Sequence, residues 1–113
     1  MEVIGLVEKA LNIRSQYHKV LAGNIANVDT PNYKEKDINF SKELESNIRR
    51  AQDIKVSEKT EQEGAGSIDG NTVNMENQMV KVTENSLFFN ALIHVVSKKL
   101  SAMRYAINEG RGG

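Results

Sequence analysis

The sequence predicts an all-α protein in which long N- and C-terminal helices pack together as a coiled-coil-like hairpin. Apolar residues recur at spacings of three and four near both ends of the 113-residue chain. The one proline follows the first of these stretches and marks a corner between them. Because 39% of the residues are hydrophobic and 5% are aromatic, a slender single unit of residues 1–113 fits better than a thick globular core.

The N-terminal helix is expected over residues 1–28. Its apolar positions form one stripe because residues three and four apart share a helix face. The small residues Ala22, Gly23 and Ala26 leave room for another helix to approach closely. The stripe consists of Leu6, Ala10, Ile13, Tyr17, Val20, Asn24 and Asn27.

The predicted corner, with an extended segment after it, occupies residues 29–40. Pro31 fixes its own φ, lacks an N–H and disfavours the helical conformation at Thr30, so the first helix must stop here. Asn32 suits a turn position that requires a positive φ, where glycine is easiest and asparagine is the best tolerated alternative. The chain is therefore expected to turn sharply after Thr30.

Three polar side chains near the corner have a predicted structural role. The amides of Asn24 and Asn27 can satisfy backbone groups freed at the corner, or fix the register against a neighbouring helix. Tyr33 can pack beside them and anchor the outgoing chain. The alternative is a solvent-exposed pair of asparagines without partners.

The middle of the chain, residues 41–70, is expected to hold a short helix and a flexible linker. The helix is predicted from apolar residues four apart, with Asn39 or Ser41 as its N-cap. These apolar residues are Phe40, Leu44 and Ile48. Residues 49–70 mix charged residues with Gln, Ser and Gly, and contain too few apolar groups to offset the cost of ordering.

The C-terminal helix, within residues 71–109, is the strongest pattern in the sequence. Asn74 is its predicted N-cap, with Glu76 in the first turn, and Gly110 is expected to end it. Ten residues alternate spacings of four and three and so form a heptad seam. The seam consists of Met75, Met79, Val82, Ser86, Phe89, Ile93, Val96, Leu100, Met103 and Ile107.

The two stripes admit two interpretations. A self-sufficient antiparallel hairpin would use them as its own core, and apolar stripes are usually core. Alternatively, the hairpin leaves apolar faces for neighbouring subunits, since further apolar residues of the C-terminal helix lie off the main seam. These are Leu87, Phe88, Leu92 and Val95. Periodicity alone does not decide between the two.

Composition argues against several classes of partner. Fifteen basic and fifteen acidic residues cancel, so no broad field would hold nucleic acid. Without cysteine there is no disulfide or thiolate metal site. The N-terminal sequence lacks the basic and unbroken apolar regions of a cleaved signal peptide, and no apolar run approaches the roughly 20 residues of a transmembrane helix.

The sequence indicates no catalytic site, no cofactor, no metal and no small-molecule substrate. His18 and His94 lie on different predicted helices, and neither has a ligand three or four residues away. The loosely spaced glycines of residues 64–70 match no phosphate-binding loop. Several carboxylates fall in a charged stretch with nothing to tune them for acid–base work, namely Glu43, Glu45, Asp53 and Glu58. An enzyme is therefore not expected.

A long motif spans the end of the first helix and the corner. Residues 21–34 read LAGNIANVDTPNYK and resemble the signature of the bacterial flagellar axial proteins, which include rod and hook proteins. Within that group, the stretch DGNTVNMENQM of residues 69–79 and the helix ending AINEG at residue 110 look like a proximal rod subunit. Family members usually have glycine after the proline, where this chain has Asn32. Asparagine tolerates a positive φ, so the corner should survive.

The resemblance implies a structural subunit of the basal-body rod, the drive shaft that crosses the periplasm and transmits motor torque to the hook. It also implies export through the flagellar type III apparatus without a cleaved signal peptide. Implied partners are other copies of the chain and neighbouring rod and basal-body proteins, in assembly needed for motility. The rival hypothesis is a helical export chaperone or adaptor in a small closed complex, which would have no reason for the corner motif.

The same resemblance implies that the two terminal helices pack in the inner layers of a helical tube. The residues predicted to form the assembly interface lie on the two stripes and the corner. They are Leu6, Ala10, Ile13, Tyr17, Val20, Asn24, Asn27, Thr30, Pro31, Tyr33, Met79, Val82, Phe89, Ile93, Val96, Leu100 and Met103.

Overall fold

The computed structural model describes residues 3–49, 54–59 and 70–112. In chain order its elements are helix α1 (Val3–Ala26), strand β1 (Lys36–Asp37), helix α2 (Phe40–Arg49), strand β2 (Ser57–Glu58) and helix α3 (Met75–Gly112). They form an elongated body of 70 × 27 × 16 Å. The prediction of a mostly helical, slender protein is confirmed.

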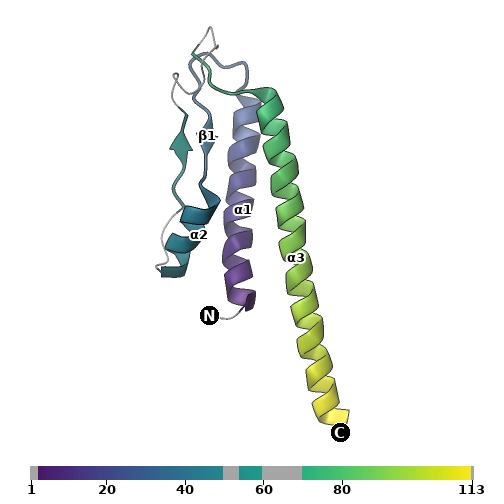
Figure 1. Cartoon of the computed structure of the whole chain (residues 1–113). Coiled ribbons are helices and arrows are strands. Elements are labelled where there is room, and N and C mark those ends of the chain that lie inside the picture. The colour runs from purple at the N-terminus through teal and green to yellow at the C-terminus, as the bar shows by residue number, and fades with distance from the viewer. Residues whose placement is uncertain (1–2, 50–53, 60–69, 113) are drawn as a thin grey trace.

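Helices α1 and α3 lie side by side and run in opposite directions (Figure 1). Helix α2 and strand β1 lie against the other side of α1, which is therefore the central element, and β2 pairs with the outer edge of β1. Helix α3 is longer than α1 and continues past its N-terminal end. The predicted hairpin of long terminal helices is thus present, with one arm projecting beyond the other.

The structure adds a two-stranded sheet to the predicted helices and places one of its strands, β2, within the predicted linker of residues 49–70. Strands β1 and β2 pair antiparallel, with Lys36 opposite Glu58 and Asp37 opposite Ser57. Backbone hydrogen bonds hold this sheet, and it is too short to leave an alternating apolar pattern in the sequence. The rest of the predicted linker, residues 50–53 and 60–69, lies outside the described residues.

The ends of the long helices also differ from the prediction. Helix α1 stops at Ala26, two residues early, and α3 runs through Gly110 to Gly112. Glycine costs only about 1 kcal/mol inside a helix relative to alanine, and here no turn or close approach requires it. A Cβ placed on Gly110 would meet no atom within 4 Å. Gly110 therefore weakens the last turns of α3 without ending them.

The predicted N-caps are confirmed for both later helices. The side-chain oxygen of Asn39 accepts a hydrogen bond from the Lys42 N–H, 3.0 Å away, and starts α2. Asn74 does the same for α3 through the Asn77 N–H at 3.1 Å. Each cap satisfies one of the N–H groups that have no partner inside the helix.

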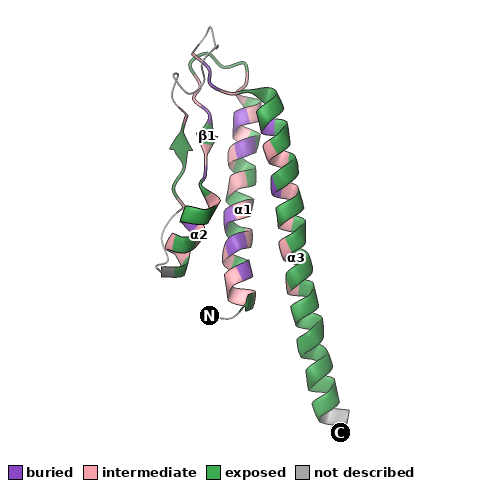
Figure 2. Cartoon of the chain, viewed as in Figure 1, coloured by how far each residue is buried: buried purple, intermediate pink, exposed green. Residues whose placement is uncertain are grey.

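The core lies mainly on α1, as Figure 2 shows by the buried residues along that helix. Its buried apolar side chains are Val7, Ala10, Ile13, Leu21 and Ile38. By contrast, the most buried residues of α3 are polar, Gln78 and Asn85, both almost inaccessible to solvent. The contact between the long helices therefore depends on polar pairing as well as on apolar burial.

Arg14 on α1 joins three helices at the middle of the molecule. Its guanidinium carbon lies 3.8 Å from the centre of the Phe40 ring on α2 and 4.6 Å from that of the Phe88 ring on α3. Its Nη1 donates to Oδ1 of Asn85 at 3.3 Å, and the Asn85 amide donates to the Arg14 carbonyl at 3.0 Å. Burial lowers the pKa of Arg14, but an arginine stays charged, so cation–π contacts and the Asn85 bond must compensate for lost hydration.

Helix α3 beyond residue 96 contacts no other element closely enough to be buried. Every described side chain from Ser97 to Gly110 is exposed, and Figure 2 shows this end of the helix in the exposed colour throughout. We name residues 97–112 the overhang. At 1.5 Å per residue the overhang is about 24 Å long.

We expect the overhang to be the least stable helical segment of an isolated monomer, because a helix of about 16 residues without tertiary contacts is marginal in water. Native-state hydrogen exchange should give near-complete protection to amides around Leu21 and Asn85 and little to those after Ser97. Equal protection along the whole of α3 in a proven monomer would contradict this expectation.

Candidate functional site

Asn24 is the centre of the corner, at the C-terminal end of α1. Its side chain is fully buried, and its amide nitrogen donates to the Lys36 carbonyl at 2.8 Å and to Gln78 Oε1 at 3.0 Å. Its oxygen accepts from the Lys36 N–H at 3.0 Å and from the Tyr33 hydroxyl at 3.3 Å. All the hydrogen bonds that a primary amide readily makes are therefore used.

The Asn24 amide pairs with Lys36 much as a neighbouring strand would. Lys36 has its N–H and C=O bonded to Asn24, whereas the adjacent Glu35 carbonyl accepts from Lys59 N–H at 2.6 Å, next to strand β2. One side chain thus satisfies the inner edge of β1 and joins it to both long helices. The predicted role for Asn24 is confirmed, and the exposed alternative is wrong.

The turn itself is held by Asn27 and Asn32. Asn27 donates from its amide to the Gly23 carbonyl at 2.9 Å and accepts from the Thr30 hydroxyl at 3.1 Å. Asn32 has a φ of 64°, as predicted for the residue after Pro31. Tyr33 lies beside Asn24 as expected, so the whole corner has one specified conformation.

Asn71 and Thr72 close the corner from the other end of the chain. The Asn71 amide nitrogen lies 2.7–3.1 Å from the carbonyl oxygens of residues 27, 28 and 30, which have no partner within α1. The Thr72 hydroxyl accepts from the Glu35 N–H at 2.6 Å and donates to the Lys59 carbonyl at 3.3 Å. Both residues are buried. Asn71 thus satisfies carbonyl groups just beyond the end of α1, and Thr72 joins Glu35 to Lys59.

Glu35 carries a buried charge just outside the corner. Its carboxylate accepts from Lys81 of α3 at 2.7 Å, and Lys59 lies 3.7 Å away on its other side. Burial alone would raise the pKa of Glu35, but the Lys81 ammonium, the Gln78 amide and the charge of Lys59 outweigh it and lower the pKa below its ordinary value. Glu35 therefore stays ionised and ties the outgoing chain to α3.

Tyr17 extends this polar cluster along α1. Burial raises the pKa of its hydroxyl, and the neighbouring Asp37 carboxylate raises it further. Asp37 in turn lies 3.9 Å from the Lys81 ammonium. The predicted stripe residue Tyr17 thus serves the hairpin's own polar contacts.

The predicted seam of α3 is divided into two halves. The residues facing α1 are half-buried and include Val82, Phe89 and Val96, with Gln78, Asn85 and Leu92 beside them. The other half, which we name the outer stripe, runs along α3 at intervals of seven residues and is mostly bare. The outer stripe comprises Met79 (53% exposed), half-buried Ser86, Ile93 (44%), Leu100 (46%) and Ile107 (55%).

The predicted interface residues accordingly fall into two groups. Those on α1 lie within the hairpin: Ala10, Ile13 and Asn24 are buried, and Leu6, Tyr17, Val20 and Asn27 are half-buried. At the corner, Thr30 and Pro31 are exposed and Tyr33 is half-buried. On α3, Met79, Ile93, Leu100 and Met103 remain exposed. The role of all these residues in assembly stays a prediction.

Several residues that position the corner and the hairpin were not recognised from the sequence. Sequence patterns do not single out Gln78 and Asn85, because polar residues beside an apolar seam are usually solvated. The signal that could have found them is that they lie seven residues apart beside the apolar seam, where each can meet a polar residue of the opposing helix, Gln78 with Asn24 and Asn85 with Arg14. Glu35 meets Lys81 across 46 residues of sequence and Asn71 meets the Thr30 carbonyl across 41, separations at which no local pattern operates.

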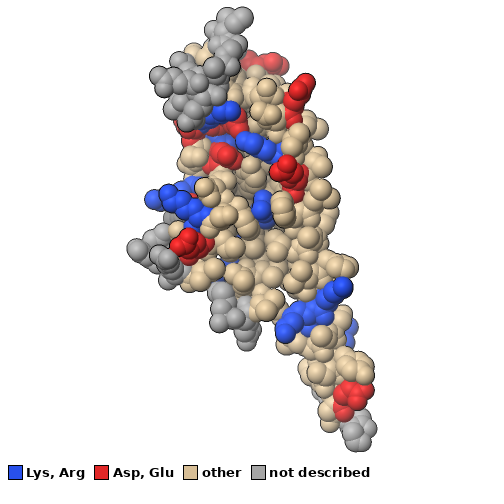
Figure 3. Space-filling view, in the orientation of Figure 1, with Lys and Arg blue, Asp and Glu red and all other residues tan. Residues whose placement is uncertain are grey.

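The surface offers little for binding a charged ligand. Figure 3 shows basic and acidic side chains interspersed on the displayed face, without a field of one sign. Among the described residues, no group of three or more His, Cys, Asp or Glu side chains is placed to hold a metal ion. No helix in the described part of the chain is long and apolar enough to cross a membrane.

Known proteins resemble this chain along most of its length. A family model for the flagella basal body rod protein matches residues 8–34, which comprise most of α1 and the corner. The chain is 30% identical to flagellar basal body rod protein FlgB of Escherichia coli (strain K12), over 91% of each sequence. It is 29% identical to FlgB of Salmonella typhimurium, again over 91% of each, and 27% identical to FlgB of Bacillus subtilis, over 93% of this chain and 92% of that protein.

The substitution Asn24→Ala should lower the free energy of unfolding by about 2–4 kcal/mol, because it removes both backbone bonds to Lys36 and leaves the buried Gln78 oxygen without its partner. Asn12→Ala, at an exposed position of the same helix, is the matched control and should change stability by less than about 0.5 kcal/mol. Urea unfolding followed by circular dichroism measures both. Equal effects of the two substitutions would contradict the role of Asn24.

Acid should destabilise the corner through Glu35. Because the folded pKa of Glu35 lies below the ordinary value of 4.5, its stabilisation is complete above that pH and is lost as the pH falls through the folded pKa. Glu35→Gln should cost about 3 kcal/mol at neutral pH and flatten the dependence of stability on pH in this range. Unfolding curves of both forms between neutral and acid pH test this, and an unchanged pH dependence would show that other groups are responsible.

Proposed function

The chain belongs to the FlgB family of flagellar basal body rod proteins, and on that premise we propose that it builds the proximal rod by packing its terminal helices against those of neighbouring subunits. It is a structural subunit of the flagellar rod, located in the basal body, and it is not an enzyme. Its neighbours are other rod proteins. The finer proposal concerns which surface meets them and how the subunit reaches its place.

The observation that carries the proposal is the outer stripe together with the overhang. Large apolar side chains that remain exposed on a folded chain usually mark an interaction surface. Here they follow one helix over several heptads, which is the pattern of a helix that receives further helices. The hairpin pairs the amides of Asn24, Asn27 and Asn71 at the corner and leaves this apolar surface for other subunits.

The arrangement fits a load-bearing shaft. Torque applied to one subunit passes to the next through side-chain packing, so each subunit needs a stiff body and extensive apolar contacts. The Asn24 corner and the Arg14 stack hold α1, α2 and α3 together. The overhang projects from this body, where a neighbouring subunit can pack against it. We propose that the rod transmits motor torque across the periplasm towards the hook through these contacts.

Further partners follow from the same family membership. We propose that copies of this chain contact one another as well as other rod and basal-body proteins. We also propose that the chain travels through the flagellar type III export apparatus without a cleaved signal peptide. A weakly protected overhang suits such passage, because a narrow export channel favours segments that unfold at low cost.

Leu100→Asp tests the assembly surface. Because Leu100 is 46% exposed and lies on the overhang, the substitution should leave the unfolding of the monomer unchanged within about 0.5 kcal/mol and yet abolish rod assembly and motility. Leu100→Met, which keeps an apolar side chain, is the matched control and should swim normally.

Two results would contradict the proposal. Normal basal bodies built from Leu100→Asp subunits would show that this face of the overhang meets no apolar neighbour. Basal bodies that form in a strain lacking the chain altogether would exclude a rod subunit and favour an adaptor in a closed complex.

A further inference from the structure

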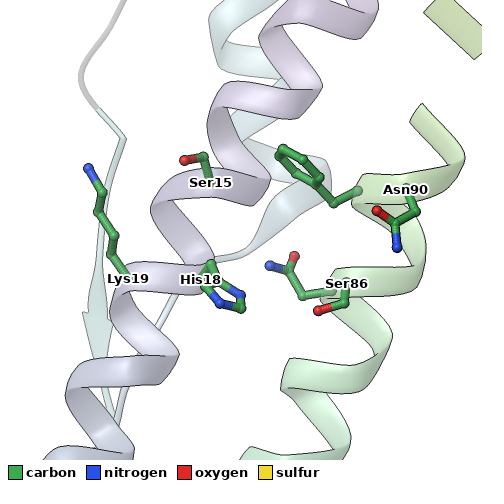
Figure 4. Close-up of a pocket in the computed structure, with 7 residues that line it drawn as sticks. Ser15, His18, Lys19, Ser86 and Asn90 are labelled. Atoms are coloured by element: carbon green, nitrogen blue, oxygen red, sulfur yellow. The ribbon is translucent and has the colours of Figure 1, made fainter. Parts of the chain in front are cut away.

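A groove runs between α1 and α3 beside the outer stripe. It has two adjoining hollows of about 400 and 570 Å³ that share Ser15 and Phe89. The first is lined by both helices, whereas the second lies along α1 and is closed on the α3 side by Phe89. Figure 4 shows the first of them, where His18 on α1 is directed towards Ser86 on α3, while the side chains of Ser15 and Lys19 extend away from α3. The groove lies next to the apolar residues that the hairpin leaves bare.

The walls of the groove suit a helix. Gly5, Ser15 and Ser86 are small, so the backbone of an incoming helix can approach closely, and Phe89 supplies an apolar floor. Ile93 of the outer stripe follows one turn further along α3 and is 44% exposed. Apolar pockets between two helices with polar rims are typical of sites that receive a third helix.

The overhang has the length and the pattern to be that helix. From Gly5 to Lys19 the groove extends over about 21 Å of α1, close to the roughly 24 Å of the overhang. Leu100, Met103 and Ile107 continue the heptad seam of Ser86, Phe89 and Ile93, of which Ser86 and Phe89 line the groove and Ile93 follows one turn beyond. Each of the three lies 14 residues, two full heptads, beyond its counterpart.

We infer that the groove receives the overhang of a second copy that runs in the same direction and is displaced by two heptads along the axis. This inference rests on the proposed function and specifies one of its contacts. Leu100 of one copy then lies beside Ser86 of the next, Met103 beside Phe89, and Ile107 beside Ile93. The displacement of 14 residues is about 21 Å, so the overhang fills the groove from end to end.

The contact has a direct consequence for the kind of assembly. It joins different surfaces of the two copies, and no rotation returns the second to the first, so the arrangement is open-ended and generates a filament and not a closed dimer. Only a handful of partly exposed apolar side chains is covered at each contact, which is small against the cost of association. Free chains therefore stay apart until neighbours on other faces add their contacts.

Cysteine pairs test the register, because the chain has no cysteine of its own. A Ser86→Cys, Leu100→Cys double variant should support motility under reducing conditions. Mild oxidation of isolated basal bodies should then convert its monomer band into a ladder of covalent oligomers. An Ile93→Cys, Ile107→Cys double variant tests the same displacement of 14 residues. It replaces the first pair if Ser86→Cys, Leu100→Cys assembles poorly.

The matched control is Ser86→Cys with Ala102→Cys, since Ala102 lies on the opposite side of the overhang, and it should stay monomeric. A ladder supports the inference. Closed covalent dimers alone, cross-links to a different rod protein alone, or no cross-link in basal bodies that contain the variant would each overturn it. None of those outcomes contradicts the proposed function. The proposed function fails instead if a strain lacking the chain builds normal basal bodies.

Discussion

One buried amide governs the arrangement of this molecule. The Asn24 side chain bonds to both backbone groups of Lys36 and to Gln78. A single residue therefore positions β1 beside the end of α1 and sets the axial register of α3 against α1. An aliphatic side chain could fill the same space but could not select one register, because apolar contacts are non-directional and hydrogen bonds are not. Asn85 repeats the device seven residues further along α3 by pairing with Arg14.

Because polar side chains fix the register of the two long helices, several apolar residues of α3 remain on the outer surface. The interface between the long helices uses Gln78, Asn85 and only one half of the heptad seam, so Met79, Ile93 and Leu100 face outward. A hairpin that buried the entire seam would be more stable alone but would offer nothing to a neighbour. The division between a hydrogen-bonded inside contact and an apolar outside surface is therefore the structural basis for a subunit that assembles.

Local features of the fold could be predicted from the sequence, and features that depend on distant residues could not. Pro31, Asn32 and the caps Asn39 and Asn74 act within a few residues, so their chemistry was readable directly. The seam of α3 was also recognised, but its division into inner and outer halves depends on where α1 lies, which periodicity does not reveal. Glu35, Asn71 and the β1–β2 pair hold together segments far apart in sequence, and their roles appear only in the folded chain.

The polar contact between α1 and α3 also has consequences for temperature. Burial of amides and charges adds little to the heat capacity of unfolding, whereas burial of methionine, leucine and isoleucine adds much. The isolated hairpin should therefore have a shallow stability curve, while the association of outer stripes should carry most of the change in heat capacity. Since apolar association weakens on cooling, a shaft built from such subunits is held together more firmly in warm cells than in cold ones, even though each hairpin changes little.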